Sequence, residues 1–173
     1  RVNAAVGAWL RGSKYAGTLA QLQAVTSGTL DLSINGTSIA LTSLDFSGAT
    51  SLSGCATVLQ TALASALAST TCAYSSQTGA FQITSPTTGE ASTITYAEDG
   101  TLATLLGLTQ AAGAVLSQGS DALDIPANMA SLRGVTENWA TFTYLYSASD
   151  DEILDLSAWA SAQGVEYLFV AWN

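Results

Sequence analysis

Apolar and polar positions follow two different patterns along this chain. Between residues 28 and 96 apolar residues mostly alternate with polar ones, apart from one helical stripe, which is typical of strands with one buried face. Beyond residue 124 they recur at helical spacing or in nearly continuous runs separated by short breaks. The two patterns predict a small, mainly antiparallel lobe of hairpins, helix and sheet, and then an α/β segment.

The strongest local signal is a hairpin around Asn35-Gly36, because this dipeptide accepts the two positive φ angles of a type I′ turn. Residues 30–34 and 37–41 form its strands. A two-residue loop fixes the register, and it places every pair on one apolar face: Ile34 opposite Thr37, Leu32 opposite Ile39, and Leu30 opposite Leu41. The tripeptide Asn35-Gly36-Thr37 also matches a glycosylation acceptor, although turn geometry already accounts for Asn35 and Gly36.

The rest of this lobe is predicted to contain a helix, further strands and a connector. The helix begins at a cap on Thr50 or Ser51, and its buried stripe is Leu52, Cys55, Leu59, Leu63 and Leu67. Strands are predicted at 71–75, 80–84 and 92–96, a short helix or turn at 101–106, and a Gly/Ala/Ser-rich connector at 110–120.

The carboxy-terminal segment predicts a βαβ unit that follows a helix. The helix spans 121–138, with Pro126 in its first turn, and a strand follows at 140–146. Ser149 and Glu152 form a capping box for the next helix, which Gly164 ends. Residues 165–172 are apolar at nearly every position, as in a strand covered on both faces. Since the chain stops at Asn173, we expect a truncated α/β lobe.

Residues 1–11 show helical spacing of apolar side chains, which predicts the end of a helix closed by Gly12. The following loop, 12–17, lacks the residue order of a phosphate-binding loop. We therefore predict an α+β protein with three parts. Residues 1–23 are assigned to the α/β lobe, 24–120 to the compact lobe, and 121–173 to the helix-strand-helix-strand segment.

Composition and charge narrow the classes of function. Apolar residues make up 48 % of the chain and charged residues only 10 %, and such a weakly charged surface favours a protein that works in an assembly. The net charge is −9, and from Tyr15 onward a single cation, Arg133, accompanies all 13 acids, which argues against nucleic acid and anionic membranes as partners. The basic amino-terminal segment, with Trp9, Arg11 and Lys14 as interface candidates, can meet an acidic face of a neighbour.

The residue types in the sequence give little support for a catalytic function. The chain has no histidine, which excludes Ser-His-Asp and Cys-His sites and removes the commonest metal ligand. Its sharpest acidic cluster offers Asp150, Asp151 and Asp155 as weak candidates for a hard cation. Acids in a first helical turn also complement the helix dipole, and this interpretation is favoured. We expect no enzyme activity and no cofactor.

The cysteines and tryptophans are interpreted as core residues. Cys55 and Cys72 are expected to be small buried side chains, with a disulfide as the alternative. Trp139, Trp159 and Trp172 lie in the apolar pattern of the βαβ unit, which favours core packing over a sugar-binding platform. No 18-residue stretch stays apolar, and none therefore predicts a transmembrane helix.

An ordered set of motifs resembles the contractile-tail sheath proteins of myovirus-type phages. The motifs are Gly28-x-Leu-x-Leu-x-Ile-Asn-Gly36, Asp45-Phe-Ser-x-Ala-Thr-Ser-Leu52, Tyr74-x-x-x-x-Gly-x-Phe-x-Ile-x-Ser85, Leu105-Leu-Gly-Leu-Thr109, Asn138-Trp139 and Leu156-Ser-Ala-Trp-Ala160. The resemblance implies a fragment of a longer structural subunit, without the terminal arms that would link neighbours by strand addition.

The resemblance also implies a function and its partners. The expected subunit polymerises with copies of itself around the tail tube, contacts baseplate proteins, and contracts during genome delivery. Its expected location is the virion tail sheath, after assembly in the bacterial host cytoplasm. The alternative is an exported adhesin or a filament protein, because the Gly-x-Phe-x-Ile half of one motif also resembles flagellar hook-associated proteins. A small α/β enzyme that uses the Asp150 cluster is the least favoured hypothesis.

Overall fold

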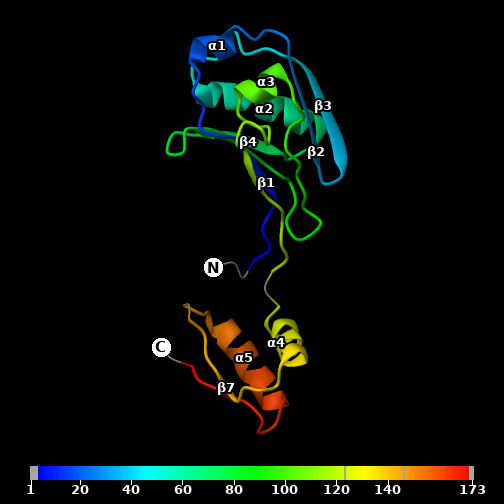
Figure 1. The fold of residues 1–173 in the computed structure, drawn as a ribbon, viewed down its shortest axis with the longest axis vertical. Helices are drawn as coiled ribbons and strands as arrows, with labels where there is room; N and C mark the ends of the chain where they lie inside the picture. Colours follow the sequence, from blue (N-terminus) through cyan, green and yellow to red (C-terminus); the bar gives the residue numbers. More distant parts are fainter. Residues whose placement is uncertain (1–3, 123, 146, 172–173) are drawn as a thin grey trace. The chain divides into compact units, whose positions relative to one another are not determined.

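A computed structural model describes residues 4–122, 124–145 and 147–171, and they form an α+β fold (Figure 1). The predicted fold class is therefore confirmed. The chain divides into two compact units: the first spans Ala5–Asp121, and the second comprises Arg1–Ala4 and Ala122–Asn173. Each unit has its own hydrophobic clusters. The described residues contain no helix that is both long and apolar enough to cross a membrane.

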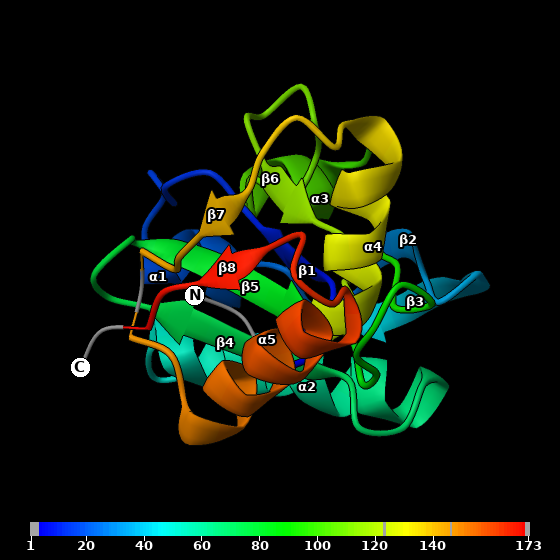
Figure 2. The ribbon, with the colours of Figure 1, turned by 90° about the horizontal axis from the view of Figure 1, so that it is seen from below.

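The first unit is built on a four-stranded antiparallel sheet with the strand order β4-β5-β1-β6. Two short helices, α1 and α3, and the longer α2 belong to the chain around it, and all three lie on one side of this sheet (Figures 1 and 2). The strands are β1 (Trp9–Arg11), β4 (Thr71–Ser75), β5 (Ala80–Thr84) and β6 (Val115–Ser117). The helices on that side are α1 (Leu19–Gln23), α2 (Leu52–Ala66) and α3 (Thr101–Leu105).

The predicted helix end at residues 1–11 is wrong for its described part. Trp9–Arg11 form β1, which lies between β5 and β6, and the predicted connector at 110–120 contributes β6. A strand this short shows no alternation of its own, and only distant partners select it over a helix. Pairing with β5 also places β1 in the same unit as residues 24–120, and not with the α/β lobe to which residues 1–23 were assigned.

The predicted hairpin is confirmed in detail. It consists of β2 (Gly28–Ile34) and β3 (Thr37–Leu44), and Ile34 pairs with Thr37 as expected. Asn35 and Gly36 have φ angles of 53° and 75°, which are the two positive values that a type I′ turn requires. Leu30, Leu32, Ile34, Ile39 and Leu41 are all buried, so the apolar face predicted from the register points into the core.

Helix α2 supplies the other half of this core. Ser51 is its cap, as one of the two predicted candidates, and its Oγ accepts a hydrogen bond from the Gly54 amide at 3.0 Å. The predicted stripe faces inward, because Cys55, Leu59 and Leu63 are completely buried. The helix packs against β4 and β3 and closes one side of the sheet.

The predicted strand at 92–96 is not formed as a strand. Ile94 makes an isolated bridge to Ile34, and its own amide and carbonyl bond to the side-chain amide of Gln118 at 2.9 Å each. A side chain thus replaces the neighbouring strand that a longer ladder would need. Because Gln118 lies far from Ile94 in the sequence, no local pattern predicts that its side chain takes the place of a strand.

The second unit contains α4 (Ile125–Val135), β7 (Thr141–Phe142), α5 (Asp150–Ala162) and β8 (Leu168–Phe169). The strands pair in parallel, which confirms the βαβ connection. Both strands are much shorter than predicted. Leu168 is 62 % exposed and Val165 is fully exposed, so the expected cover on both faces is not present among the described residues. The apolar run at 165–172 was interpreted as a strand covered on both faces. In the structure, α5 contacts β8 on one side.

Candidate interaction surface

The open face of the four-stranded sheet carries the interface candidates of the amino-terminal segment. Two rows of paired residues cross this face: Thr71, Thr84, Trp9 and Ser117, and then Ala73, Gln82, Arg11 and Val115. The row between them points the other way, and its members Cys72, Ile83 and Leu10 are buried in the core. Strand alternation therefore presents Trp9 and Arg11 on the side of the sheet opposite α1, α2 and α3.

Trp9 and Arg11 interact directly on this face. The guanidinium carbon of Arg11 lies 5.5 Å from the ring centroid of Trp9, which is a cation–π contact. Both side chains are half-buried. Since the other members of the two rows are neutral, Arg11 is the single charge among these eight paired residues.

Lys14 lies at the same end of the sheet as Arg11. After Arg11 the chain continues along the β4–β5 turn, where the Tyr15 amide donates to the Gly79 carbonyl at 2.8 Å. The stem of Lys14 lies against Gly79, because a Cβ built on that glycine would be 3.2 Å from Lys14 Cγ. Neither Arg11 nor Lys14 forms an ion pair with another described residue. The structure thus brings the three interface candidates to one region and leaves both charges accessible.

An acidic hollow occurs elsewhere on the same unit. Its volume is about 480 Å³, and it is lined by Tyr96, Ala97, Glu98, Asp99, Gln110 and Ala111. The Glu98 amide donates to the Asp31 carbonyl of β2 at 2.8 Å, and the Ala97 amide donates to Leu108, the third residue after α3. These bonds attach the hollow to the hairpin and to α3, on the helix-bearing side of the sheet.

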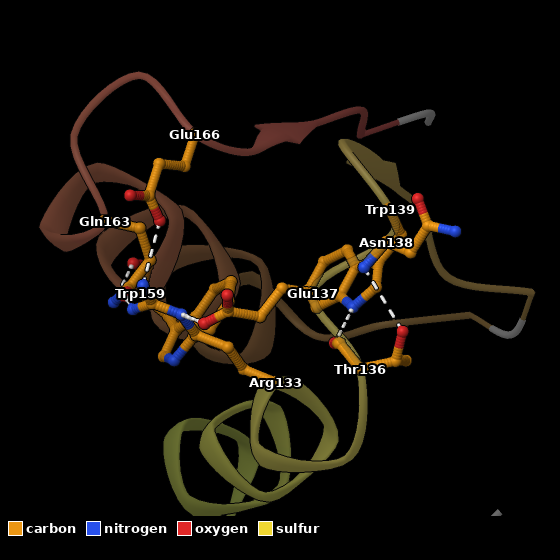
Figure 3. Close-up of polar contacts among 8 residues, drawn as sticks. All are labelled: Arg133, Thr136, Glu137, Asn138, Trp139, Trp159, Gln163 and Glu166. Carbon is orange, nitrogen blue, oxygen red and sulfur yellow. Dashed lines mark hydrogen bonds and ion pairs between the residues drawn. The ribbon is translucent and has the colours of Figure 1, made fainter.

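Arg133 organises the second unit. From the last turn of α4 it forms ion pairs with Glu137 at 3.3 Å and Glu166 at 3.0 Å, and it donates a further hydrogen bond to the Gln163 side chain (Figure 3). Its guanidinium carbon also lies 5.8 Å from the ring centroid of Tyr167. One cation therefore joins α4, the end of α5 and the segment before β8.

Aromatic rings fill the space beside Arg133. Trp139 stacks on Tyr167 with ring centroids 4.3 Å apart, and Phe142 meets Trp159 edge-on at 5.8 Å. The indole nitrogen of Trp139 donates to the Thr136 carbonyl at 2.8 Å (Figure 3). Trp159 is buried and Trp139 half-buried, which confirms core packing for Trp159 and partly for Trp139. Trp172 lies outside the described residues.

The acidic cluster at the start of α5 acts as a helix cap. The buried Glu152 carboxylate accepts hydrogen bonds from the amide and the hydroxyl of Ser149, at 2.7 and 2.9 Å. Asp150, Asp151 and Asp155 are exposed. Among the described residues, no group of three or more Asp, Glu, Cys or His side chains converges as a metal site would require. The capping interpretation of Glu152 is confirmed.

The two cysteines are free, buried thiols. Burial raises the pKa of the Cys72 thiol to about 12, and burial also raises the pKa of Cys55. Both groups are therefore neutral at physiological pH and poor nucleophiles. The prediction of small buried residues is confirmed, and the disulfide alternative is not adopted.

Asn35 of the glycosylation tripeptide is engaged inside the protein. Its amide nitrogen donates to Thr87 Oγ1 at 2.9 Å, and its carbonyl oxygen accepts from the Ser85 hydroxyl and the Thr93 amide at 3.0 Å each. The side chain ties the hairpin turn to the loop after β5. This amide therefore has a structural role that the turn signal alone did not reveal.

Sequence reasoning missed the Arg133 contacts and the closure of the first unit. Arg133 and Glu137 stand four residues apart on the chain, and that spacing was a usable signal for their pair. The contacts of Arg133 with Gln163 and Glu166 span about 30 residues and left no signal. At the ends of the first unit, Val6 and Ser120 exchange backbone hydrogen bonds, and no local sequence pattern predicts this pairing.

A family model described as "E217 tail sheath protein gp31, insert domain" matches residues 5–120 of the chain. The matched range coincides, to within one residue, with the structural unit Ala5–Asp121. The resemblance to phage tail sheath proteins is thereby confirmed. No curated protein matches the chain.

Proposed function

The chain belongs to the family of the E217 tail sheath protein gp31 insert domain, and from this membership we propose that it is a structural subunit of a contractile tail sheath. The family assigns it a structural role in the sheath of the virion tail and indicates a non-enzymatic protein. We further propose that it polymerises with its own copies around the tail tube, contacts baseplate proteins and contracts during genome delivery. In this proposal assembly takes place in the host cytoplasm.

One observation carries the proposal: the ends of the matched range and of the structural unit agree to within one residue, and those ends meet. The Val6 amide donates to Ser120 at 2.9 Å, and the Ser120 amide donates back at 3.2 Å. A domain whose two ends are paired can be inserted into a loop of another domain with little disturbance of that domain. This geometry supports the role of Ala5–Asp121 as an inserted domain of a larger sheath subunit.

The second unit supports the same proposal. A two-stranded sheet is marginal by itself, and parallel sheets are normally covered on both faces. Among the residues that the structure describes, seven of the eight exposed large apolar residues lie here: Leu132, Val135, Leu145, Leu154, Val165, Leu168 and Val170. We infer that Ala122–Asn173 belongs to the sheath lobe that carries the insert, and that other parts of the sheath cover these residues.

Imaging tests the proposal most directly. Negative-stain microscopy of the full-length sheath protein, purified over a range of salt and protein concentrations, is expected to show helical tubes. Tubes assembled on isolated tail tubes should shorten and widen when contraction is triggered. A protein that stays monomeric under all these conditions contradicts polymerisation. Binding on a glycan array, together with the absence of tubes, would instead support the adhesin alternative.

A further inference from the structure

We propose that the open sheet face around Trp9 and Arg11 of one copy binds the acidic hollow beside Glu98 and Asp99 of a second copy. The proposal rests on the sheath function for its biological setting, and it names the contact surfaces within that assembly. Each surface belongs to the unit Ala5–Asp121.

Trp9 and Arg11 have the chemistry of an interface centre. Tryptophan and arginine are enriched among the residues that contribute most to protein–protein binding, and a stacked guanidinium is held in place with its donors still free. Arg11 stacks on Trp9 within β1, which pairs with β5 on one side and β6 on the other. The neighbouring residues on β5 and β6 have neutral side chains. Val115, in the same row as Arg11, adds a side chain that is 48 % exposed. The face thus combines apolar and polar side chains around one central cation.

The charge balance of the unit identifies the occupant. Arg11 and Lys14 are its two cations, and its acids are Asp31, Asp45, Glu90, Glu98, Asp99 and Asp121. Both cations lack an ion pair with any described residue, although acids are in threefold excess. A second copy of the same chain therefore offers an acidic surface that is complementary to this face. Opposite potentials favour association, and like charges would oppose it.

The hollow beside Glu98 is the acidic surface that fits best. It combines two adjacent exposed carboxylates with Tyr96 and a depression of about 480 Å³. A concave acidic surface can receive the Arg11 guanidinium and the Lys14 ammonium together. By contrast, the Asp45 carboxylate already accepts the Ser47 amide, and the Asp121 carboxylate accepts the Glu90 amide.

The positions of the two surfaces determine the kind of assembly. Within the first unit, the Trp9–Arg11 face is the side of the sheet opposite α1, α2 and α3, whereas the hollow is attached to β2 and to α3 on the helix-bearing side (Figures 1 and 2). A contact between two different surfaces is heterologous. When the rotation between copies does not close, repetition of such a contact generates an open helix. Contacts of this type suit a helical sheath.

Site-specific crosslinking tests the contact. One preparation of the 173-residue chain carries Val115→Cys on the open face, and a second, differently tagged preparation carries Gln110→Cys in the hollow. A short bismaleimide is added to the mixture, while the native thiols stay unreactive because they are buried. The Val115–Gln110 heterodimer is expected to form at least roughly tenfold faster than a control heterodimer with Ala66→Cys, an exposed position at the end of α2.

Charge reversal then tests the chemistry. Arg11→Glu in the Val115→Cys preparation is expected to reduce the crosslinking rate to the control level, and Glu98→Lys plus Asp99→Lys in the partner should restore it. Glu90→Lys, the same charge change outside the hollow, should not restore it. Arg11→Gln provides a milder variant, and circular dichroism verifies the fold of each protein. Equal rates for the hollow and the control position, or no effect of Arg11→Glu, would overturn the contact. Tubes without this crosslink would reject the interface and leave the sheath function intact.

Discussion

Val6 and Ser120 lie opposite each other in an antiparallel bridge that closes the first unit. The bridge continues the pairing of β1 with β6, in which Trp9 faces Ser117. The two ends of the unit are thus joined by backbone hydrogen bonds, although 113 positions separate the two bridge residues, from 7 to 119. This closure accounts for the agreement between the family match and the structural unit, and it defines where the unit can be separated from the rest of the chain.

The first prediction follows from that closure: residues 5–121 fold cooperatively on their own, whereas residues 24–121 do not. The shorter piece lacks β1, which lies between β5 and β6 and buries Leu10 completely. Its removal would leave β6 without a partner strand. Amide dispersion in a ¹H–¹⁵N spectrum and a single thermal transition would identify the folded piece.

Limited proteolysis of the whole chain provides the control for this prediction. The first cuts are expected immediately after Asp121, beyond the bridge of Val6 and Ser120 that closes the first unit, and not within 30–105. Early cuts inside 30–105 would contradict an independently folded unit. A well-dispersed spectrum for residues 24–121 would show that β1 is dispensable and would favour the boundary predicted from the sequence.

The second prediction concerns Gly119, next to the closing bridge. A Cβ at this position would collide with the Gly89 carbonyl oxygen and would lie 2.6 Å from Ser92 Cβ. Gly119→Ala is therefore expected to lower the free energy of unfolding by about 1–3 kcal/mol. Gly48→Ala is the matched control, because a Cβ there meets no atom within 4 Å, and its effect should stay within about 0.5 kcal/mol. Urea titrations followed by circular dichroism measure both values, and equal effects would contradict the close approach.

The third prediction is a decrease of stability at alkaline pH that depends on Cys72. Burial raises the pKa of this thiol from its ordinary 9.0 to about 12. The folded state therefore holds the proton more tightly than the unfolded state. The resulting stabilisation is complete below pH 9 and is lost as the pH rises toward 12. Over this window Cys72 should contribute a slope of up to about 1.4 kcal/mol per pH unit.

Cys72→Ala should be less stable than the parent at pH 7, and it should show a shallower decrease above pH 9. Urea unfolding at pH 7, 9 and 10.5 measures the two slopes. Tyrosines also titrate in this range, and the comparison with Cys72→Ala removes their contribution. Parallel slopes for the two proteins would mean that the thiol titrates normally in the folded state.

Local signals predicted the elements of this protein well where neighbours in the sequence determine the structure. The Asn35-Gly36 turn fixed the register of its hairpin, and the capping box of Ser149 and Glu152 fixed the start of α5. In both cases the deciding contacts lie within a few residues. The stripe of α2 was equally readable, because one face of a helix repeats along a single element.

Elements that distant residues determine were not predicted. β1 is a strand because Leu10 pairs with Ile83 and Leu116, which are both more than 70 positions away. Ile94 forms no ladder because the Gln118 side chain occupies the place of a strand. Arg11 and Lys14 were selected from charge and Trp9 from its place beside Arg11, and the stacking of Arg11 on Trp9 became visible only in the structure.

The last prediction concerns Arg133 in the second unit. Its side chain is 35 % exposed, so each of its ion pairs is partly screened and contributes at most about 1 kcal/mol. It also donates to Gln163 and stacks near Tyr167, and these contacts add packing that salt does not screen. Arg133→Ala is therefore expected to destabilise the second unit by about 1–2 kcal/mol. Arg133→Lys should recover only a part, because an ammonium cannot hold Glu137, Gln163 and Glu166 in one planar fork.

Tryptophan fluorescence provides the measurement for Arg133, since Trp159 lies beside its side chain (Figure 3) and Trp139 stacks on Tyr167, which its guanidinium contacts. Urea titrations at low salt and at 0.5 M NaCl separate the two contributions, because salt should weaken the ion pairs and leave the stacking in place. Glu137→Gln is the control: its carboxylate is 71 % exposed, and its loss should cost less than about 0.5 kcal/mol. If Arg133→Lys is as stable as the parent, a single charge is sufficient and the planar geometry of the guanidinium is not what joins α4 to the segment before β8.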